Sequence, residues 1–302
     1  MSKSLLILGG TGFIGKHVAR RAIKEKYETF VLSRNIPKIE ERIKGCKYLQ
    51  CDLTNPDNMK IIKSYKFNYV INLSGDILHN DFRNGGKSVI DIHLNALINL
   101  LSIMPRDNLL GFVQIGSSDE YGDSPAPQIE NQKEKPFSSY SYAKFAATNF
   151  IQYLSRAECF PGKILRPFLI YGPGQDENRL IPYVIKKALN NEIVQISSGN
   201  QLRDFLYIED AVDVIFLALV NDRLNGEIVN IGSGNPVKVK YIVEKIIANI
   251  GLGKAVYGKR KLRKGEIMNL YPNIEYAKKY LSWEPTISLE EGLKKIITSM
   301  KE

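Results

Sequence analysis

An apolar run that ends in a glycine-rich loop constrains the fold of this chain more than any other feature of its sequence. Residues 4–10 read SLLILGG, which is typical of a buried strand that ends in a turn. Gly9, Gly12 and Gly15 have the spacing G-x-x-G-x-x-G, and a helical pattern follows to about Lys26. Glycines let the backbone turn tightly and approach a pyrophosphate, and the free N–H groups of a helix N-terminus bind that anion. The stretch therefore predicts a dinucleotide site.

Further apolar runs alternate with helical stretches along the first 172 residues. This alternation predicts an α/β fold with a doubly wound parallel sheet of the Rossmann kind, which binds ligands beyond the carboxyl ends of its strands. The expected strands are ETFVLS (28–33), CKYLQCD (46–52), NYVINLSG (68–75), GFVQIGSS (111–118) and KILRPFLIYG (163–172).

The regular alternation of expected strands and helices ends after Gly172, where loops rich in Gly, Asn and Pro separate shorter elements. We expect residues 1–172 to form the dinucleotide-binding domain and residues 173–302 to form mainly a smaller lobe. Some elements of the later half are expected to return to the sheet.

The composition limits which cellular compartment and which binding partners we expect for this chain. No apolar run approaches the ~18 residues that a membrane span needs, and the start MSKSLLILGG is too short and turns too soon for a signal peptide. We therefore expect a cytoplasmic protein without a membrane partner. The formal net charge of +10 suits nucleic acid or a substrate that carries phosphates. The densest basic run is KRKLRK at 259–264. From its charge alone, a solvated loop is as good an interpretation as a binding site.

The cysteines and histidines show no pattern of a metal or disulfide site. The cysteines are odd in number and form no C-x-x-C, and the histidines are scattered. We expect no metal ion and a structural role for each histidine. The residues are Cys46, Cys51, Cys159, His17, His79 and His93.

The end of the second expected strand bears on the choice of cofactor. A carboxylate about 20 residues beyond a glycine loop would hold the ribose 2′-OH of NAD. Here the segment reads VLSRN, with Ser33 and Arg34 and no acid. Arg34 can pair with a 2′-phosphate through its planar guanidinium, which favours NADP over NAD. The alternative is an ordinary exposed arginine.

Two tyrosines precede one lysine in SSYSYAK, residues 138–144. Residues four apart share a helix face and residues two apart do not, so a helix here would put Tyr140, and not Tyr142, beside Lys144. A nearby ammonium favours the phenolate form of tyrosine. Such a tyrosine can exchange a proton with a hydroxyl or a carbonyl group near neutral pH.

Six segments in the same order resemble the extended short-chain dehydrogenase/reductase family, whose members act on nucleotide sugars. They are GGTGFIG (9–15), CDL (51–53), GSSDEYG (116–122), YSYAK (140–144), LRPFLIYGPG (165–174) and LRDFLYIEDAVD (202–213). The resemblance implies that Ser117 assists Tyr140, that Asp52 meets the adenine and that Lys144 also holds the nicotinamide ribose. The expected cofactor contacts are Gly9, Thr11, Gly12, Phe13, Ile14, Gly15, Ser33, Arg34, Asn35, Asp52, Leu53, Leu73, Tyr140, Lys144 and Pro167.

The second half resembles the nucleotide-sugar lobe of that family. By resemblance, Arg203 and Arg263 pair with the diphosphate, while Asn178 and Arg179 contact the nucleotide. This gives one member of the basic run a specific role, so we expect a nucleotide-sugar substrate and no nucleic-acid partner. For each arginine, a surface salt bridge is the alternative.

Dehydratases of the family carry Thr-Asp-Glu where this chain has Ser117, Ser118 and Asp119. Ser118 replaces the acid that would protonate a leaving hydroxyl, and Asp119 is a shortened base, so we expect these two residues to bind substrate and not to dehydrate it. The segments GPGQDENRLIP and SSGNQLRDFLYIEDAVDVI look most like reductases of 4-keto-6-deoxy or 3,6-dideoxy sugar nucleotides of the paratose and abequose synthase type, which serve deoxysugar and polysaccharide biosynthesis.

The resemblance therefore implies an NADPH-dependent reductase of a C4 ketone, with Tyr140 as the acid. A nucleotide-sugar 4-epimerase with the same residues is the first alternative. A regulator that senses NADP without turnover is the second, although retention of Ser117, Tyr140 and Lys144 together argues against it.

Two helical stretches, about 87–104 and 141–158, carry apolar residues on more than one face. The family commonly forms dimers through a four-helix bundle of these helices, so we expect a homodimer. The alternative is burial of the same residues in the core. In the first stretch they are Val89, Ile92, Ala96, Leu97, Leu100, Leu101 and Met104.

Overall fold

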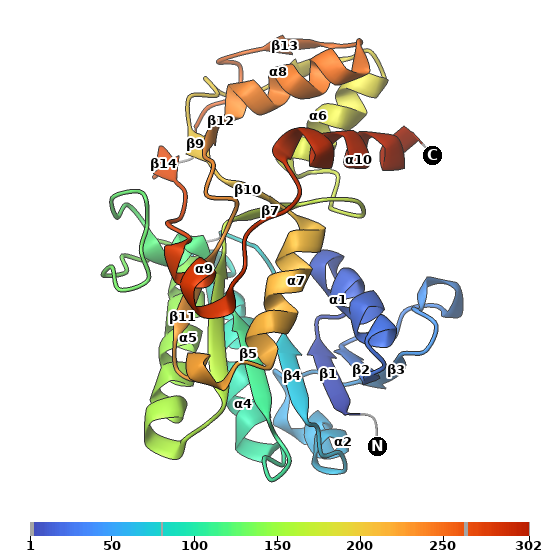
Figure 1. Ribbon diagram of the computed structural model, residues 1–302, viewed down its shortest axis with the longest axis vertical. Coiled ribbons are helices and arrows are strands. Elements are labelled where there is room, and N and C mark those ends of the chain that lie inside the picture. Colours follow the sequence, from blue (N-terminus) through green and yellow to red (C-terminus); the bar gives the residue numbers. More distant parts are fainter. Residues whose placement is uncertain (1–2, 80, 263–264, 302) are drawn as a thin grey trace. The chain divides into compact units, whose positions relative to one another are not determined.

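The computed structural model describes residues 3–79, 81–262 and 265–301, which divide into two compact units. The first unit comprises residues 1–122, 134–166 and 212–229, and the second comprises 123–133, 167–211 and 230–302. Each unit is thus assembled from separate stretches of the chain, which the colours of Figure 1 make visible.

A seven-stranded sheet has the order β11-β6-β5-β4-β1-β2-β3. The pairs from β6 through β3 are parallel, with Leu6 opposite both Phe30 and Val70 in the middle of the sheet. Its strands are β1 (Ser4–Leu8), β2 (Glu28–Ser33), β3 (Lys47–Gln50), β4 (Tyr69–Asn72), β5 (Gly111–Ile115), β6 (Gly162–Pro167) and β11 (Ile228–Ile231). The predicted α/β fold with a doubly wound parallel sheet is confirmed.

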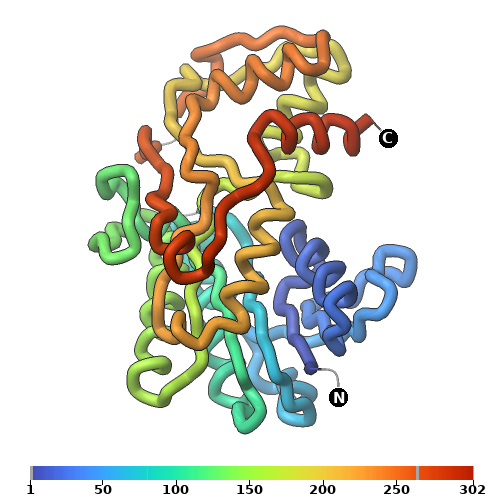
Figure 2. Tube along the Cα trace, in the orientation of Figure 1, coloured from blue at the N-terminus to red at the C-terminus, as the bar shows by residue number. Residues whose placement is uncertain are grey.

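Some elements of the later half were expected to return to the sheet, but no strand was located over β11, because the NIGSGNP stretch that begins inside it was interpreted as a loop. β11 lies beside β6, although the two strands are far apart in the sequence, as the chain trace in Figure 2 shows. The last expected strand, 163–172, is interrupted at Phe168. Its remainder, β7 (Leu169–Tyr171), pairs in parallel with β10 (Phe205–Tyr207) in a separate sheet.

Helices cover both faces of the large sheet in the first unit (Figure 1). On one face, apolar side chains of α2 (Lys60–Lys63), α4 (Ala96–Ile103) and α5 (Ser139–Glu158) join those of the strands in one buried cluster. On the other, α1 (Phe13–Lys24) and the part of α7 (Ile208–Leu219) within this unit are tied by an ion pair of Arg21 Nη1 with Asp213 Oδ1 at 2.6 Å. The central strands are therefore buried on both sides, which explains their near-continuous apolar sequences.

The continuous helix expected over 87–104 is divided in the structure. It consists of α3 (Gly86–Ile90), a π-helical turn (Asp91–Asn95) and α4. Of its listed apolar residues, all except the half-buried Ile92 are buried within the chain, which agrees with the core alternative for them. A π-helical turn inserts a residue into the helix and commonly marks a functional position.

The second unit is built from short elements. Its strands form small sheets, β9 (Leu202–Arg203) between β12 (Val237–Lys238) and β14 (Asn269–Leu270), and β8 (Ile193–Gln195) with β13 (Lys254–Val256). Its helices are α6 (Leu180–Leu189), α8 (Val239–Ile250), α9 (Glu275–Leu281) and α10 (Leu289–Lys301). Among all the described helices, none is long and apolar enough to cross a membrane.

Candidate active site and cofactor loop

The glycine loop after β1 forms a cradle that side chains would fill. Gly9 has φ +72°, and a Cβ there would lie 2.8 Å from the carbonyl oxygen of Leu73. A Cβ on Gly15 would lie 2.2 Å from the carbonyl oxygen of Gly9. Gly12 is the N-cap of α1, and none of the described side chains caps its N–H groups. The loop thus presents backbone donors at a helix N-terminus, which fits the pyrophosphate of a dinucleotide.

Arg34 follows β2 and keeps its guanidinium accessible. Its side chain is 60% exposed, and its ion pair with Asp76 is loose, with 3.8 Å between Nη2 and Oδ2. Ser33 donates its hydroxyl to the carbonyl oxygen of Asn35 at 2.7 Å, which shapes the turn. Hydrogen bonds from the hydroxyl and amide of Thr54 lower the pKa of Asp52. Arg34 is therefore exposed just beyond the end of β2, with only a loose ionic partner among the contacts described here.

The remaining predicted cofactor residues lie at strand and helix ends. Leu53 is buried and accepts a hydrogen bond from Asn99 at its carbonyl oxygen. Thr11 lies in the glycine loop, Phe13 and Ile14 begin α1, Leu73 follows β4, and Pro167 ends β6 in the second unit.

The start of α5 fixes the two tyrosines in different surroundings. Ser138 caps the helix, with its hydroxyl accepting from the amide of Ser141 at 3.1 Å. Tyr140 is buried, whereas Tyr142 is 50% exposed. Lys144 Nζ lies 6.0 Å from the centroid of the Tyr140 ring. The helix thus turns one phenol toward the lysine and the other toward solvent.

Lys144 is buried, and its ammonium donates to the carbonyl oxygen of Ile115 at the end of β5, at 2.9 Å. Burial lowers the pKa of Lys144 to about 8, and the charge of Glu120 opposes this effect. The lysine is consequently charged at neutral pH and close to losing that charge.

Ser117 follows β5 and is held by a buried ion pair. Its amide donates to Glu120 Oε1 at 2.7 Å, and its hydroxyl accepts from the amide of Asp119 at 3.2 Å. The other oxygen of Glu120 accepts from Arg166 Nε at 2.9 Å, and both side chains are fully buried. Arg166 also pairs with Glu134 at 2.6 Å. Sequence reasoning missed Glu120 and Arg166, because an acid in SSDEYG gives no sign of its distant partner.

Two imidazoles, those of His79 and His93, contact the ring of Tyr140, which sequence reasoning also missed. The ring centroid of His79 lies 5.2 Å away and that of His93, in the π-helical turn, lies 5.3 Å away. His93 Nε2 is 2.9 Å from the carbonyl oxygen of Asp76, and burial lowers the pKa of His93 to about 3. A Cβ on Gly75 would lie 1.8 Å from this imidazole, so glycine is required there.

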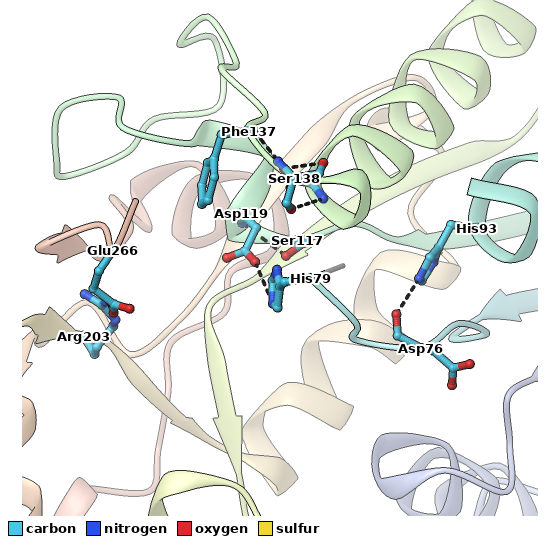
Figure 3. Close-up of polar contacts among 10 residues, drawn as sticks. Asp76, His79, His93, Ser117, Asp119, Phe137, Ser138, Arg203 and Glu266 are labelled. Atoms are coloured by element: carbon cyan, nitrogen blue, oxygen red, sulfur yellow. Dashed lines mark hydrogen bonds and ion pairs between the residues drawn. The ribbon is translucent and has the colours of Figure 1, made fainter. Parts of the chain in front are cut away.

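Ser118 and Asp119, the predicted substrate contacts of the first unit, differ in their surroundings. Ser118 is buried, whereas Asp119 is half-buried and its Oδ2 lies 3.7 Å from His79 Nε2 (Figure 3). Ser118 has a hydroxyl group where the dehydratase pattern has its acid, and Asp119 stands at the position of the base. Within the described residues, no three acidic, cysteine or histidine side chains are grouped as a metal ion would require.

In the second unit, Arg203 on β9 is nearly buried and points its guanidinium at Glu266. Nη2 lies 2.5 Å from Glu266 Oε1 (Figure 3). Nη1 donates to the carbonyl oxygens of Leu202 and Met268. Asn178 and Arg179 are exposed just before α6. Arg263, the other predicted diphosphate contact, lies outside the described residues.

Comparisons with known proteins agree on one family. The model of the NAD dependent epimerase/dehydratase family matches residues 5–232. A putative UDP-glucose 4-epimerase of Methanocaldococcus jannaschii is 30% identical over 98% of both chains. CDP-abequose synthase of Salmonella muenchen is 28% identical over 100% of this chain and 99% of its own. The structure of UDP-glucose 4-epimerase from Thermotoga maritima with UDP-glucose has a TM-score of 0.92, at 25% identity over 99% and 98% of the two chains.

Proposed function

Because the chain belongs to the NAD dependent epimerase/dehydratase family, we propose that it reduces the C4 ketone of a nucleotide-linked 4-keto-6-deoxy or dideoxy hexose with NADPH. The observation that carries the proposal is the buried arrangement of Tyr140 beside Lys144, with Ser117 after the neighbouring strand and no dehydratase acid at Ser118. These groups suit proton exchange with an oxygen and not elimination of water.

In the proposed reaction each residue has one task. Tyr140 gives its phenolic proton to the oxygen of the reduced carbon, and the Ser117 hydroxyl hydrogen-bonds that oxygen. The charge of Lys144 stabilises the phenolate left on Tyr140. The glycine cradle fits the cofactor pyrophosphate, and NADPH, when bound, supplies the hydride.

The preference for NADPH rests on Arg34. Its exposed guanidinium and the absence of an acid from VLSRN suit a 2′-phosphate better than a ribose hydroxyl. A reductase consumes its cofactor in every cycle, so a freely exchanged reductant agrees with this role.

The full-length similarity to a CDP-abequose synthase supports a reductase acting on a nucleotide sugar. The similarity to proteins named UDP-glucose 4-epimerase favours a second candidate, a nucleotide-sugar 4-epimerase that uses the same three residues. An epimerase returns its hydride to the same sugar and has no net need for NADPH. A non-catalytic NADP sensor would have no need to keep Ser117, Tyr140 and Lys144 together.

The two candidates differ in cofactor stoichiometry. The purified protein, given NADPH and a panel of 4-keto-6-deoxy sugar nucleotides with different bases, is expected to oxidise one NADPH per sugar reduced. Deuterium on the nicotinamide C4 is expected at sugar C4 by mass spectrometry. Interconversion of a sugar nucleotide with NAD retained through purification and no NADPH loss would establish the epimerase instead.

We also propose a homodimer, for which exposed apolar side chains of α4 and α5 provide surface. Ile98 and Tyr153 are exposed on these helices. Light scattering of the eluted protein is expected to give twice the chain mass of 34.2 kDa.

A further inference from the structure

Reduction of a ketone to an alcohol consumes a proton as well as a hydride, and this proton must enter from solvent in every cycle. In the proposed function Tyr140 loses its proton to the sugar oxygen and must regain one before the next turnover. Within the described residues, the side chains of Lys144, His93 and His79 are ionisable and lie close to the Tyr140 ring.

Lys144 and His93 are poorly suited to carry this proton from solvent. Lys144 is 5% exposed, and its ammonium is hydrogen-bonded to the carbonyl oxygen of Ile115. His93 is 4% exposed, and its Nε2 is joined to the carbonyl oxygen of Asp76. The low pKa of His93, caused first by burial and then by the charge of Lys144, keeps its imidazole neutral throughout the physiological range.

His79 differs from both in its access to water. Its side chain is 31% exposed, while its ring edge contacts the Tyr140 ring in a T-shaped arrangement. Asp119 Oδ2, at 3.7 Å from Nε2, is the carboxylate that faces it. Histidine ordinarily changes charge near neutral pH, and a carboxylate beside it stabilises the imidazolium.

We infer that His79, oriented by Asp119, is the proton-supplying residue that reprotonates Tyr140 from solvent after each reduction. This inference rests on the proposed reductase function and extends it. The imidazolium N–H bond breaks and the phenolic O–H bond forms, directly or through one water molecule. The neutral imidazole then takes a proton from water or buffer, so one solvent proton is consumed for each NADPH oxidised.

If His79 reprotonates Tyr140, its removal should slow every turnover except the first. Tyr140 begins protonated, so His79→Ala is expected to transfer its first hydride at nearly the wild-type rate in stopped flow. Steady-state turnover is then expected to fall at least about tenfold, less than the ~10²–10⁴-fold that a proton-transfer group contributes to a chemical step, because water can still reprotonate Tyr140 slowly. A burst of one NADPH per site followed by a slow phase is the expected trace.

Small acids should replace the missing side chain. Imidazole in the buffer is expected to restore the slow phase of His79→Ala in proportion to its concentration. Asp119→Asn, measured at saturating sugar nucleotide because Asp119 is also a predicted substrate contact, is expected to lose less steady-state turnover than His79→Ala, because the imidazole remains. The matched control is His93→Gln, on another edge of the same ring, which should slow both phases together and respond to no buffer acid.

Calorimetric affinities for NADPH and for the sugar nucleotide are expected to be unchanged in His79→Ala. Equal slowing of both phases, an unchanged steady state, or no response to imidazole would overturn the inference while leaving the reductase intact. If the wild type reduces none of the 4-keto sugar nucleotides, the proposed function fails and the inference fails with it.

Discussion

The surroundings of Tyr140 and those of Arg203 are built in different ways. Tyr140 is enclosed by side chains from several parts of the first unit, including Lys144 on its own helix and the imidazoles of His79 and His93. Arg203 in the second unit is held mainly by backbone carbonyl groups and by one carboxylate, Glu266. The first arrangement surrounds a phenol with ionisable side chains, whereas the second pairs a guanidinium with one carboxylate and with the backbone.

The difference teaches which kind of effect a substitution should have. Groups that must act on one atom need neighbours on every side, because a small displacement changes proton transfer steeply. A guanidinium that binds an anion contributes through its donors and its charge, which tolerate small displacements better than proton transfer does. We therefore expect losses of rate around Tyr140 and losses of affinity at Arg203.

The largest expected effect is at the reacting phenol. Tyr140→Phe is expected to fold and to bind NADPH but to lose at least about 10²-fold in kcat, the usual scale for a lost acid. Tyr142→Phe, two residues away and exposed, is the matched control and should retain nearly full activity. Equal losses in steady-state kinetics would show that the buried ring is not the acid.

A substitution at Arg34 tests whether the affinity for the cofactor can change while the rate of reaction does not. Arg34→Ala is expected to weaken NADPH by about 1.5–3 kcal/mol, the scale of a charge-assisted contact, and to leave NADH almost unchanged. Calorimetric titration of both cofactors against both proteins measures this. A wild type that prefers NADH would contradict the proposed role of Arg34.

Arg203 provides the corresponding test in the second unit. Arg203→Ala is expected to raise KM for the sugar nucleotide about tenfold, near the lower end for a lost charged hydrogen bond, with NADPH affinity unchanged. Arg203→Lys keeps the charge and should recover part of the loss. A large fall in NADPH affinity would place Arg203 at the cofactor instead, and the proposed separation of roles would be lost.

The smallest expected effect is a decline in rate at alkaline pH. The pKa of Lys144 is about 8, so its charge is present below that pH and is lost as the pH rises through it. Without this charge the phenolate is less stabilised, and Tyr140 becomes a weaker acid. We expect kcat to fall several-fold between about pH 7.5 and 9. Lys144→Arg keeps its charge over this range. If this variant binds substrate, its kcat should decline only at a higher pH than that of the wild type. A decline at the same pH in this variant would assign it to another group.

The sequence predicted those parts of the site that depend on short spacing. The four-residue step from Tyr140 to Lys144 defines a helix face, and the glycine loop follows its strand directly, so both could be anticipated from local geometry. The family named by resemblance is confirmed by the comparison over residues 5–232.

Features that depend on long-range packing were missed. Some return of later elements to the sheet was expected, but the edge strand β11 could not be located, because it is recognisable only by its partner β6. The π-helical turn with His93 was missed because it has the same apolar pattern as an ordinary helix. His79 and Glu266 meet Asp119 and Arg203 only through the fold. No spacing in the sequence records such pairs, because each joins segments whose separation is set by the tertiary structure.

The buried pair of Glu120 and Arg166 restricts how this site can change over evolutionary time. Removing one partner of a buried pair typically costs about 3–5 kcal/mol, a large part of the ~5–15 kcal/mol that stabilises a domain. Replacing both partners together by apolar residues is often neutral. Because Glu120 also holds the amide of Ser117, a lineage that leaves this arrangement must change two distant codons almost at once. Descendants of this chain are therefore expected to keep both residues or neither.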